Sequence, residues 1–303
     1  MPYVIAPVIE RLATTRKVRM KTPDFLYHYT SIEGLSHILS SKKIRFSRLD
    51  FLDDMEEGGS KDPVDWRKYF FVSCWSATSE ESIPLWSMYT KNMTGVRIKI
   101  RTEMFKKYYL DAKSIPKFLN IADTSSAPPG AQITFQTYMP YEEMHGEDYM
   151  VMPPSWGDGF WPFPVEYTDD ENKLSQQLIQ YNSETDQTKV SSFEIAKYKR
   201  EVWRFQDEWR FRLYCHSAAP RSLLGQIDEQ QYFDLMVRSL STLGRGISRE
   251  YFYLSLDEEA FSGIEILLGP KVDTAHEIIV KALIDSYCPS AKLASSNLKG
   301  KIK

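Results

Sequence analysis

The sequence predicts an α+β domain in which strands and helices are mixed and the sheet has antiparallel character. Two observations lead to this class. Short segments with period-two hydrophobic alternation occur along the chain, and helix-like patterns separate only some of them, without a regular βαβ repeat. The chain also lacks the glycine-rich phosphate motifs of dinucleotide-binding and P-loop folds. Any bound nucleotide must therefore be held by other means.

Length and composition indicate an ordinary globular protein. The 303 residues are 42% hydrophobic and 26% charged, which suffices for a substantial core. Aromatic residues make up 14% of the chain and can wall a pocket or stack on a flat ligand. The formal charge of −3 argues against a wide electrostatic footprint for nucleic acid, but it leaves room for a local basic groove.

Cysteine usage and the N-terminal segment indicate a cytoplasmic protein. Cys74, Cys215 and Cys288 are far apart and lack metal-like spacing, so we expect neither a disulfide framework nor a metal site. Residues 1–21 lack the continuous apolar core of a signal peptide. No segment reaches the roughly 18 apolar residues of a membrane helix. We therefore expect a soluble chain with no membrane partner.

The pattern predicts one main domain with two terminal extensions. Residues 1–24 form an N-terminal extension, residues 25–290 a single domain, and residues 291–303 a tail whose end is frayed. Within the domain, residues 103–164 are predicted to be an irregular insertion, because they are rich in proline, glycine and aromatic residues and have few periodic runs.

The first predicted unit is a strand, a helix and a second strand. Residues 25–29 form an aromatic strand, and Thr30–Glu33 have the spacing of a capping box that starts a helix. The helix should end within residues 40–43. Residues 44–47 then alternate as a strand, and the acidic segment 49–59 predicts a loop or a short broken helix.

The second predicted unit begins with a buried strand at residues 69–75. A helix starts at Ser82, with proline in its first turn, and Trp86 and Tyr89 share one of its faces. Residues 96–100 alternate as the next strand. This order places an aromatic pair between two strands.

The remaining predicted elements follow the insertion. Residues 171–205 are polar and predicted to be largely helical, since four apolar residues keep roughly helical spacing. A strand with one apolar and one charged face begins at Glu208. Residues 251–256 and 263–272 predict two further strands, and residues 274–287 a closing helix. The four spaced residues are Ile195, Tyr198, Val202 and Phe205.

Four features carry the candidate chemistry: a histidine, an arginine pair, an aromatic pair and a charged strand. Each also has a structural explanation. A histidine between tyrosines is often a hydrogen-bonded core residue, aromatic residues at helical spacing usually pack in the core, and strand charges form solvated ends or cross-strand ladders. The residues concerned are His28, Arg45, Arg48, Trp86, Tyr89, Glu208, Arg210 and Arg212.

The order of these motifs resembles a widespread bacterial family of uncharacterised domains. Its members open with a Y-[HK]-Y strand, continue through an fnDpxE loop, a W-x-x-Y…G-V-x-I segment and an E-x-R strand, and close on I-x-G. The resemblance spans residues 25 to about 285, and Asp54 stands where the family usually has proline. The corresponding segments are Tyr27–Tyr29, Leu52–Glu56, Trp86–Tyr89, Gly95–Ile98, Glu208–Arg210 and Ile266–Gly269.

The opening unit also resembles that of ADP-ribosyltransferases, including toxins that modify DNA bases. In that superfamily a first-strand histidine binds the adenosine ribose of NAD, an aromatic residue stacks on nicotinamide, and a later-strand glutamate completes an H-Y-E triad. The resemblance implies a split β-sheet core and gives these catalytic roles to His28, Tyr89 and Glu208. It also implies that NAD is contacted by His28, Tyr29, Thr30, Arg45, Arg48, Trp86, Tyr89 and Arg210.

These residue types suit cleavage of the nicotinamide–ribose bond. The reaction builds positive charge on the ribose, which a nearby carboxylate stabilises. The planar fork of an arginine, Arg45 or Arg48, suits the pyrophosphate. We therefore expect an NAD-dependent ADP-ribosyltransferase-like enzyme that acts as a toxin or phage-defence effector. Its acceptor stays open among protein, nucleic acid and water, and residues 150–164 either face the acceptor or cap the core.

Two alternatives belong to other classes. The first is a non-catalytic module that binds a nucleotide or a partner protein on the same fold. The second is an RNA-directed nuclease or phosphotransferase, in which the acidic loop binds Mg²⁺. The acidic pI disfavours this second alternative. Its candidate ligands are Asp53, Asp54, Glu56 and Glu57.

Overall fold

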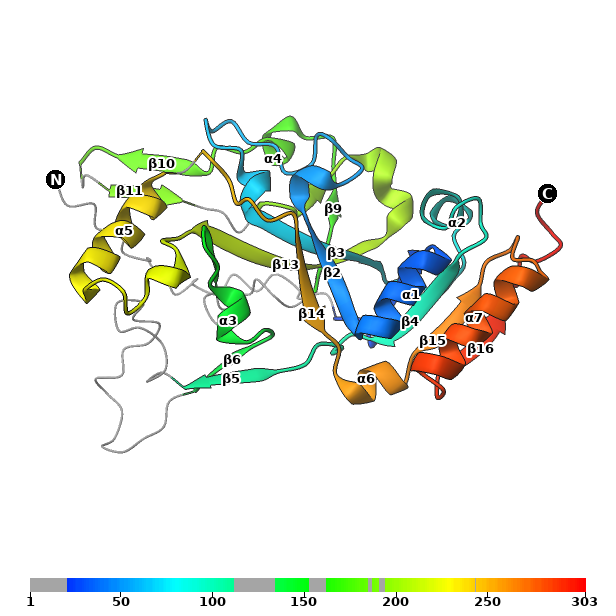
Figure 1. Ribbon diagram of the computed structural model, residues 1–303. Helices are drawn as coiled ribbons and strands as arrows, with labels where there is room; N and C mark the ends of the chain where they lie inside the picture. The colour runs from blue at the N-terminus through cyan, green and yellow to red at the C-terminus, as the bar shows by residue number, and fades with distance from the viewer. Residues whose placement is uncertain (1–20, 112–133, 153–161, 185–186, 191–193, 243) are drawn as a thin grey trace.

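The computed structural model describes residues 21–111, 134–152, 162–184, 187–190, 194–242 and 244–303. These residues form an α+β fold around one large mixed sheet (Figure 1), as the sequence predicts. The main path of the sheet runs through β14 (Tyr251–Ser255), β2 (Lys43–Arg48), β3 (Phe70–Ser76), β1 (Phe25–Thr30), β4 (Val96–Arg101), β15 (Glu265–Leu268) and β16 (Lys292–Ser295).

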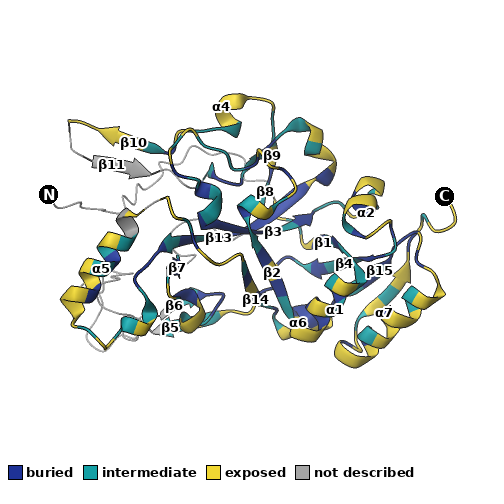
Figure 2. Ribbon diagram, turned by 45° about the horizontal axis from the view of Figure 1, so that its top comes forward, coloured by how far each residue is buried: buried dark blue, intermediate teal, exposed yellow. Residues whose placement is uncertain are grey.

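The sheet divides between β1 and β2. Strand β13 (Glu208–Ser217) pairs with every residue of β3, so it occupies one complete edge of β3. Strands β1 and β2 must share the other edge, where β1 meets Ser76 and β2 meets Phe71 and Val72. No strand of the described residues pairs with the edge of β3 between these two pairings. Figure 2 shows β3 and β13 as mainly buried strands in the middle of the molecule.

Three helices cover one face of the sheet. They are α1 (Ile32–Ser41), α6 (Glu258–Ser262) and α7 (Thr274–Tyr287), and α1 and α7 lie side by side in Figure 1. Their apolar side chains enter the same core as Leu26 and Ile98 of the sheet. Burial of this apolar surface is the main driving force for the assembly.

The start of α1 differs by one residue from the predicted capping box. Ser31, not Thr30, is the N-cap, and its side chain accepts a hydrogen bond from the backbone N–H of Gly34. Thr30 is still the last residue of β1. Since either hydroxyl residue can cap a helix, the local spacing alone could not choose between them.

Helix α2 (Ile83–Tyr89) covers part of the opposite face. It begins at the N-cap Ser82, as expected, and packs Trp86 against Tyr29 of β1. Leu298 and Ile302 near the C-terminus join the same cluster. The predicted fraying of residues 295–303 is therefore wrong, because Ser296 and Asn297 form hydrogen bonds with Glu81, and Leu298 and Ile302 pack beside α2.

The prediction of a largely helical segment at 171–205 is also wrong. Its apolar residues do not share a helical face, since Ile195 is buried and Val202 is 72% exposed. Leu178 and Ile179 instead donate their backbone N–H groups to Asp62. The observed elements are α4 (Glu171–Leu174), β10 (Ile179–Asn182), β11 (Gln187–Val190), β12 (Tyr198–Lys199) and a 3₁₀ helix (Glu201–Gln206).

The predicted insertion contains short elements that flank the sheet. Strands β5 (Tyr108–Asp111) and β6 (Thr134–Thr137) pair with each other, and β7 (Tyr149–Val151) and β8 (Phe163–Pro164) pair with β13. Most of the predicted acceptor surface at 150–164 lies outside the described residues. The remaining α-helices and strands are α3 (Tyr141–Met144), β9 (Glu166–Tyr167) and α5 (Glu229–Ser241), and three short 3₁₀ helices span Leu49–Phe51, Trp66–Tyr69 and Arg221–Leu223. No helix in the described ranges is both long and apolar enough to cross a membrane.

Candidate functional site

The candidate site is centred on the first residues of β13. Asp207 takes a left-handed backbone conformation with φ of 42°, which turns the chain out of the 3₁₀ helix and into the strand. Glu208 then lies opposite Ser76 of β3, and Arg210 lies opposite Cys74. Because side chains alternate along a strand, Glu208 and Arg210 share one face. The sequence predicted this alternation, but the charged face is buried rather than exposed to solvent.

Arg210 binds two carboxylates. Its side chain is fully buried, and its Nε and Nη2 donate to Glu208 at 2.6 and 2.9 Å. Its Nη1 and Nη2 also donate to Glu57, the second of them at 3.0 Å. Nη1 makes a further hydrogen bond to the carbonyl of Ala196. The guanidinium is therefore committed to the fold, and it is not open to the NAD pyrophosphate in this structure.

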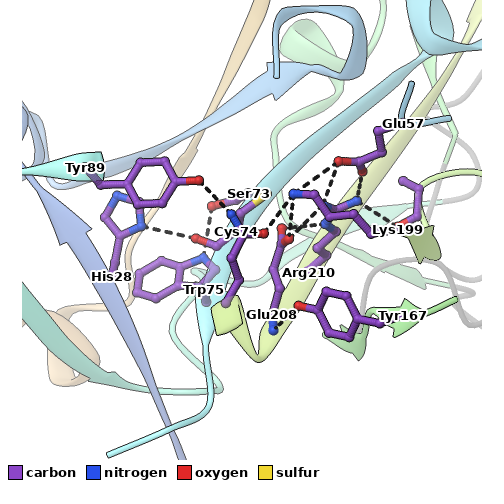
Figure 3. Close-up of polar contacts among 12 residues, drawn as sticks. His28, Glu57, Ser73, Cys74, Trp75, Tyr89, Tyr167, Lys199, Glu208 and Arg210 are labelled. Carbon is purple, nitrogen blue, oxygen red and sulfur yellow. Dashed lines mark hydrogen bonds and ion pairs between the residues drawn. The ribbon is translucent and has the colours of Figure 1, made fainter. Parts of the chain in front are cut away.

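Lys199 completes the cluster. Its Nζ lies 3.4 Å from Glu208 and 3.5 Å from Glu57, and it donates to Gln206 Oε1 at 2.8 Å. Glu57, Lys199, Glu208 and Arg210 thus form what we call the buried charge cluster, shown in Figure 3. Two negative and two positive charges balance, which is the condition under which buried ionic groups are tolerated.

The cluster keeps Glu208 ionised. Burial acts to raise its pKa, but the charges of Arg210 and Lys199 outweigh this effect and hold the pKa below its ordinary value. The reverse applies to Arg210: burial would lower its pKa, and the two carboxylates raise it. The backbone N–H of Glu208 donates to the hydroxyl of Tyr167 at 2.9 Å, which fixes the start of the strand. Glu208 is thus a positioned carboxylate.

Tyr89 connects to this cluster through Gln206. Its hydroxyl accepts a hydrogen bond from Gln206 Nε2 at 2.8 Å, and the carbonyl oxygen of the same amide accepts from Lys199. Burial and the carboxylate of Asp53 raise the pKa of Tyr89, so the phenol stays protonated. The predicted stacking residue, Tyr89, is therefore connected to the predicted catalytic Glu208 by hydrogen bonds through Gln206 and Lys199.

His28 lies where the sheet divides. Its Nδ1 donates to the carbonyl of Cys74 at 3.1 Å, and its ring packs against Trp75 with centroids 5.0 Å apart. The carbonyl of Cys74 belongs to the part of β3 that has no strand partner on this edge, so the imidazole takes the place of a strand N–H. His28 therefore has a structural role at the division of the sheet, where its Nδ1 binds the Cys74 carbonyl.

The protonation state of His28 follows from the same contacts. Burial lowers its pKa, and the nearby charge of Arg45 lowers it further against the effect of the Cys74 hydrogen bond. The ring is therefore neutral, with its proton on Nδ1 and an acceptor lone pair on Nε2. Among the described residues, Nε2 has no hydrogen-bond partner. It can accept a hydrogen bond from a ligand hydroxyl.

The strand register places the side chains of His28 and Glu208 on opposite faces of the sheet. Ser76 lies opposite both Tyr27 and Glu208, so these three side chains share a face. His28 alternates with Tyr27 and belongs to the other face. Cys74 joins the two sides: its carbonyl binds His28, while burial and the charge of Glu208 raise the pKa of its thiol. Figure 3 shows Cys74 between His28 and Glu208.

The other predicted NAD contacts have structural partners. Trp86 is fully buried and donates to Glu81 at 3.0 Å, and the hydroxyl of Tyr29 accepts from the backbone N–H of Ser82 at 3.1 Å. The fork of Arg48 is occupied by Asp50, at 2.7 and 3.0 Å. These polar groups are therefore already engaged in contacts within the protein.

Thr30, the last residue of β1, and Arg45, on β2, are the two remaining predicted NAD contacts. Thr30 Oγ1 packs so closely on α1 that a Cβ at Gly34 would lie 2.0 Å from it. Arg45 is exposed on β2, with its guanidinium over the ring of Tyr251 at 4.9 Å. Of the two arginines predicted for the pyrophosphate, only Arg45 is open to solvent and free of a carboxylate partner among the described residues.

The acidic loop does not form the magnesium site that one alternative requires. Glu57 binds Arg210, and Glu56 forms an ion pair with Arg200. The described residues contain no group of three or more histidine, cysteine or acidic side chains arranged around a metal position. The sequence thus singled out Glu57 only as a candidate magnesium ligand of the disfavoured alternative, and its contact with Arg210 was not predicted. It missed Lys199, because nothing in the local sequence marks a lysine as buried.

Comparison with known proteins gives one match. Residues 85–211 match a family model described as "Protein of unknown function (DUF2971)". This agrees with the predicted resemblance to an uncharacterised domain family over the segments that contain Trp86–Tyr89, Gly95–Ile98 and Glu208–Arg210. The other quoted segments lie outside the match: Tyr27–Tyr29, Leu52–Glu56 and Ile266–Gly269. No curated protein and no solved structure matches the chain.

Proposed function

We propose that the chain is an ADP-ribosyltransferase-type enzyme that uses NAD as a substrate. One observation carries the proposal: His28, Tyr89 and Glu208, which are far apart in the sequence, are tied to one small region of β3 and β13. His28 reaches it through Cys74, and Tyr89 reaches it through Gln206. The three residue types of the H-Y-E resemblance thus border the division of the sheet, with His28 on the face opposite to that of Glu208.

The proposed chemistry assigns one task to each residue. Nε2 of His28 accepts a hydrogen bond from a ribose hydroxyl, and the ring of Tyr89 stacks on nicotinamide. The C1′–N bond breaks, and its electron pair leaves with nicotinamide. An acceptor oxygen or nitrogen then bonds to C1′ and releases its proton to solvent. Glu208 stabilises the positive charge that develops on the ribose.

The electrostatics favour a stabilising role for Glu208 over a role as general base. A carboxylate whose pKa is held low stays charged at neutral pH, which suits charge stabilisation, but it accepts a proton poorly. Access to Glu208 requires a displacement of the side chains that cover it, since the residue is 5% exposed. The acceptor, protein or nucleic acid, and a role as toxin or phage-defence effector belong to this proposal through the resemblance alone.

The decisive experiment measures nicotinamide release from NAD labelled on the adenylate, with and without total protein, DNA and RNA. Wild type should release nicotinamide, and Tyr89→Ala and Glu208→Gln should reduce turnover by orders of magnitude. Glu265→Gln is the matched control, because Glu265 pairs with Lys99 on the partly exposed side of β15. Thermal unfolding of each variant separates lost chemistry from lost structure. The absence of turnover in folded wild type would contradict the proposal.

A second candidate is a non-catalytic module that binds a nucleotide or a partner protein. The observation that favours it is the closed cluster itself, in which both oxygens of Glu208 already have cationic partners. In that case Glu208 stabilises the fold and has no catalytic role. Binding of NAD without nicotinamide release, in wild type and in Tyr89→Phe alike, is the result that this candidate requires.

A further inference from the structure

A group of aromatic and basic side chains covers the outer face of β2 and β14. The two strands pair over five residues, with Tyr253 opposite Arg45 and Tyr251 opposite Ser47. Opposite residues in an antiparallel pair share a face. The alternate residues are buried in the core, so these four form the outer surface (β14 lies beside β2 in Figure 1). The buried alternates are Ile44, Phe46, Phe252 and Leu254.

Cation–π contacts connect this face into a row. The guanidinium of Arg45 lies 4.9 Å from the ring of Tyr251, whose centroid is 6.2 Å from that of Phe51. The guanidinium of Arg48 follows at 4.8 Å from Phe51. We call Arg45, Tyr251, Phe51 and Arg48 the arginine–aromatic row. Its planar groups have π faces and flat cations, the two kinds of group on which nucleobases stack.

The arginine–aromatic row and Tyr253, which lies opposite Arg45, are partly open to solvent and carry an uncompensated charge. Phe51 and Tyr253 are each 47% exposed, so part of each ring is accessible to a ligand. Arg48 is neutralised by Asp50. Arg45 has no carboxylate partner in the described part of the chain, so its charge is available to an anion. Ser47 lies opposite Val72 of β3, so Arg45, two residues earlier on β2, lies near the division of the sheet.

We propose that the outer face of β2 and β14 binds single-stranded nucleic acid, with bases stacked on Tyr253 and Phe51 and a backbone phosphate on Arg45. Exposed rings on a sheet face stack on unpaired bases, whose π faces are accessible, whereas a duplex keeps its bases stacked internally. The positive charge of Arg45 complements the phosphate backbone. The proposal goes beyond NAD cleavage and does not depend on it.

Fluorescence anisotropy with short fluorescein-labelled oligonucleotides of mixed sequence tests the surface. Wild type should bind single-stranded RNA or DNA more tightly than a blunt duplex of the same sequence. Tyr253→Ala and Phe51→Ala should each weaken binding by about 5- to 150-fold, the equivalent of about 1–3 kcal/mol for one stacked base. Arg45→Ala should reduce the slope of log K against log salt concentration by about 0.7, the value for one lost phosphate contact on a single strand.

Tyr287→Ala is the matched control. Tyr287 ends α7 and is 45% exposed, against 47% for Tyr253, so its loss removes a similar surface ring outside the row. It should bind the oligonucleotide as wild type does. Thermal unfolding should show that all variants are folded, since Tyr253 and Phe51 are exposed side chains.

The outcomes separate this proposal from the proposed function. The proposed binding surface is contradicted if wild type does not bind single strands or binds the duplex equally well. It is also contradicted if Tyr253→Ala and Phe51→Ala both keep wild-type affinity. Complete displacement of the oligonucleotide by NAD, together with loss of NAD binding in Tyr253→Ala, also overturns it and identifies a mononucleotide subsite instead. Nicotinamide release by wild type is measured in parallel. Binding without release overturns only the proposed function, and release without binding overturns only the surface.

Discussion

Glu57 and Glu208, which belong to a loop and to a strand far apart in the chain, bind the same guanidinium, that of Arg210. Each carboxylate also lies within 3.5 Å of Lys199 Nζ. The buried charge cluster thus ties the acidic loop, β12 and β13 together at the candidate site. Its members are far from solvent, and for this reason the removal of one charge has larger effects than the removal of a surface ion pair.

Replacement of Arg210 should destabilise the fold strongly. In Arg210→Met two buried carboxylates keep only Lys199 as a cationic partner, and loss of one partner from a buried ionic group costs about 3–5 kcal/mol. Urea unfolding measures the change in the free energy of unfolding. Arg204→Ala is the control, because Arg204 pairs with Glu201 on the surface with 63% of its side chain exposed. That exposed pair should contribute about 0–1 kcal/mol. A similar loss in both variants would show that the cluster is no more important than a surface pair.

Acid should destabilise the protein through Glu208. Burial acts to raise the pKa of Glu208, but Arg210 and Lys199 hold it below its ordinary value of 4.5. The unfolded chain therefore takes up this proton first as the pH falls. The stabilisation is fully present above about pH 4.5 and is lost as the pH falls toward the folded-state pKa. Urea unfolding between about pH 3 and pH 7 should give a shallower acid slope in Glu208→Gln than in wild type.

Glu265→Gln serves as the control for this pH series, since Glu265 is a partly exposed partner of Lys99. Its acid slope should stay close to that of wild type. An unchanged slope in Glu208→Gln would mean that Glu208 does not carry the acid sensitivity.

The sequence allowed prediction of those elements whose pattern is local. Strand β1, helix α1 and strand β2 follow from aromatic and apolar residues at strand and helix spacing, and the start of α2 follows from Ser82 with proline in the first turn. The alternation of β13 was also visible. In each case the residues that decide the structure lie within one or two turns of one another.

The burial of the charged face of β13 could not be predicted, because it depends on contacts between distant segments. Glu57 lies in a loop that suggested metal binding, and Lys199 lies in a stretch that suggested a helix. The helix prediction failed because four apolar residues at helical spacing gained no common partner, and the backbone of Ile179 bonds to Asp62 instead. The role of Trp86 likewise depends on its packing partner, Tyr29.

Gly95 is expected to tolerate no side chain. A Cβ at this position would lie 2.2 Å from the carbonyl oxygen of Thr30 and 3.1 Å from Cα of Ser31, so the end of β1 would have to move. Gly95→Ala should therefore lose about 1–3 kcal/mol of stability, the usual cost of overpacking. Gly263→Ala is the control, since its nearest contact is 3.5 Å and its φ is −91°. Thermal unfolding of both variants checks the difference, and equal melting temperatures would contradict the expectation.

The contributions of the hydroxyl and of the ring of Tyr89 to nicotinamide release should be separable by substitution. Tyr89→Phe removes the acceptor of the Gln206 hydrogen bond, whose net contribution to stability is about 0.5–1.5 kcal/mol, and keeps the ring. If the ring stacks on nicotinamide, Tyr89→Phe should retain most of the nicotinamide release that Tyr89→Ala loses. Steady-state release assays on the two variants test this. Equal loss in both would assign the function to the hydroxyl.

Two substitutions of His28 should separate its structural contact from its proposed catalytic contact. Nδ1 donates to the Cys74 carbonyl at the division of the sheet, so His28→Ala leaves that carbonyl without its partner and should cost about 1–3 kcal/mol. His28→Asn places an amide N–H near the position of Nδ1 and should recover part of this stability in urea unfolding. Neither variant has the Nε2 acceptor, so both should lose nicotinamide release if a ribose hydroxyl binds there. Recovery of stability together with full activity in His28→Asn would restrict His28 to its structural role, whereas stability without activity would assign both roles to the same ring.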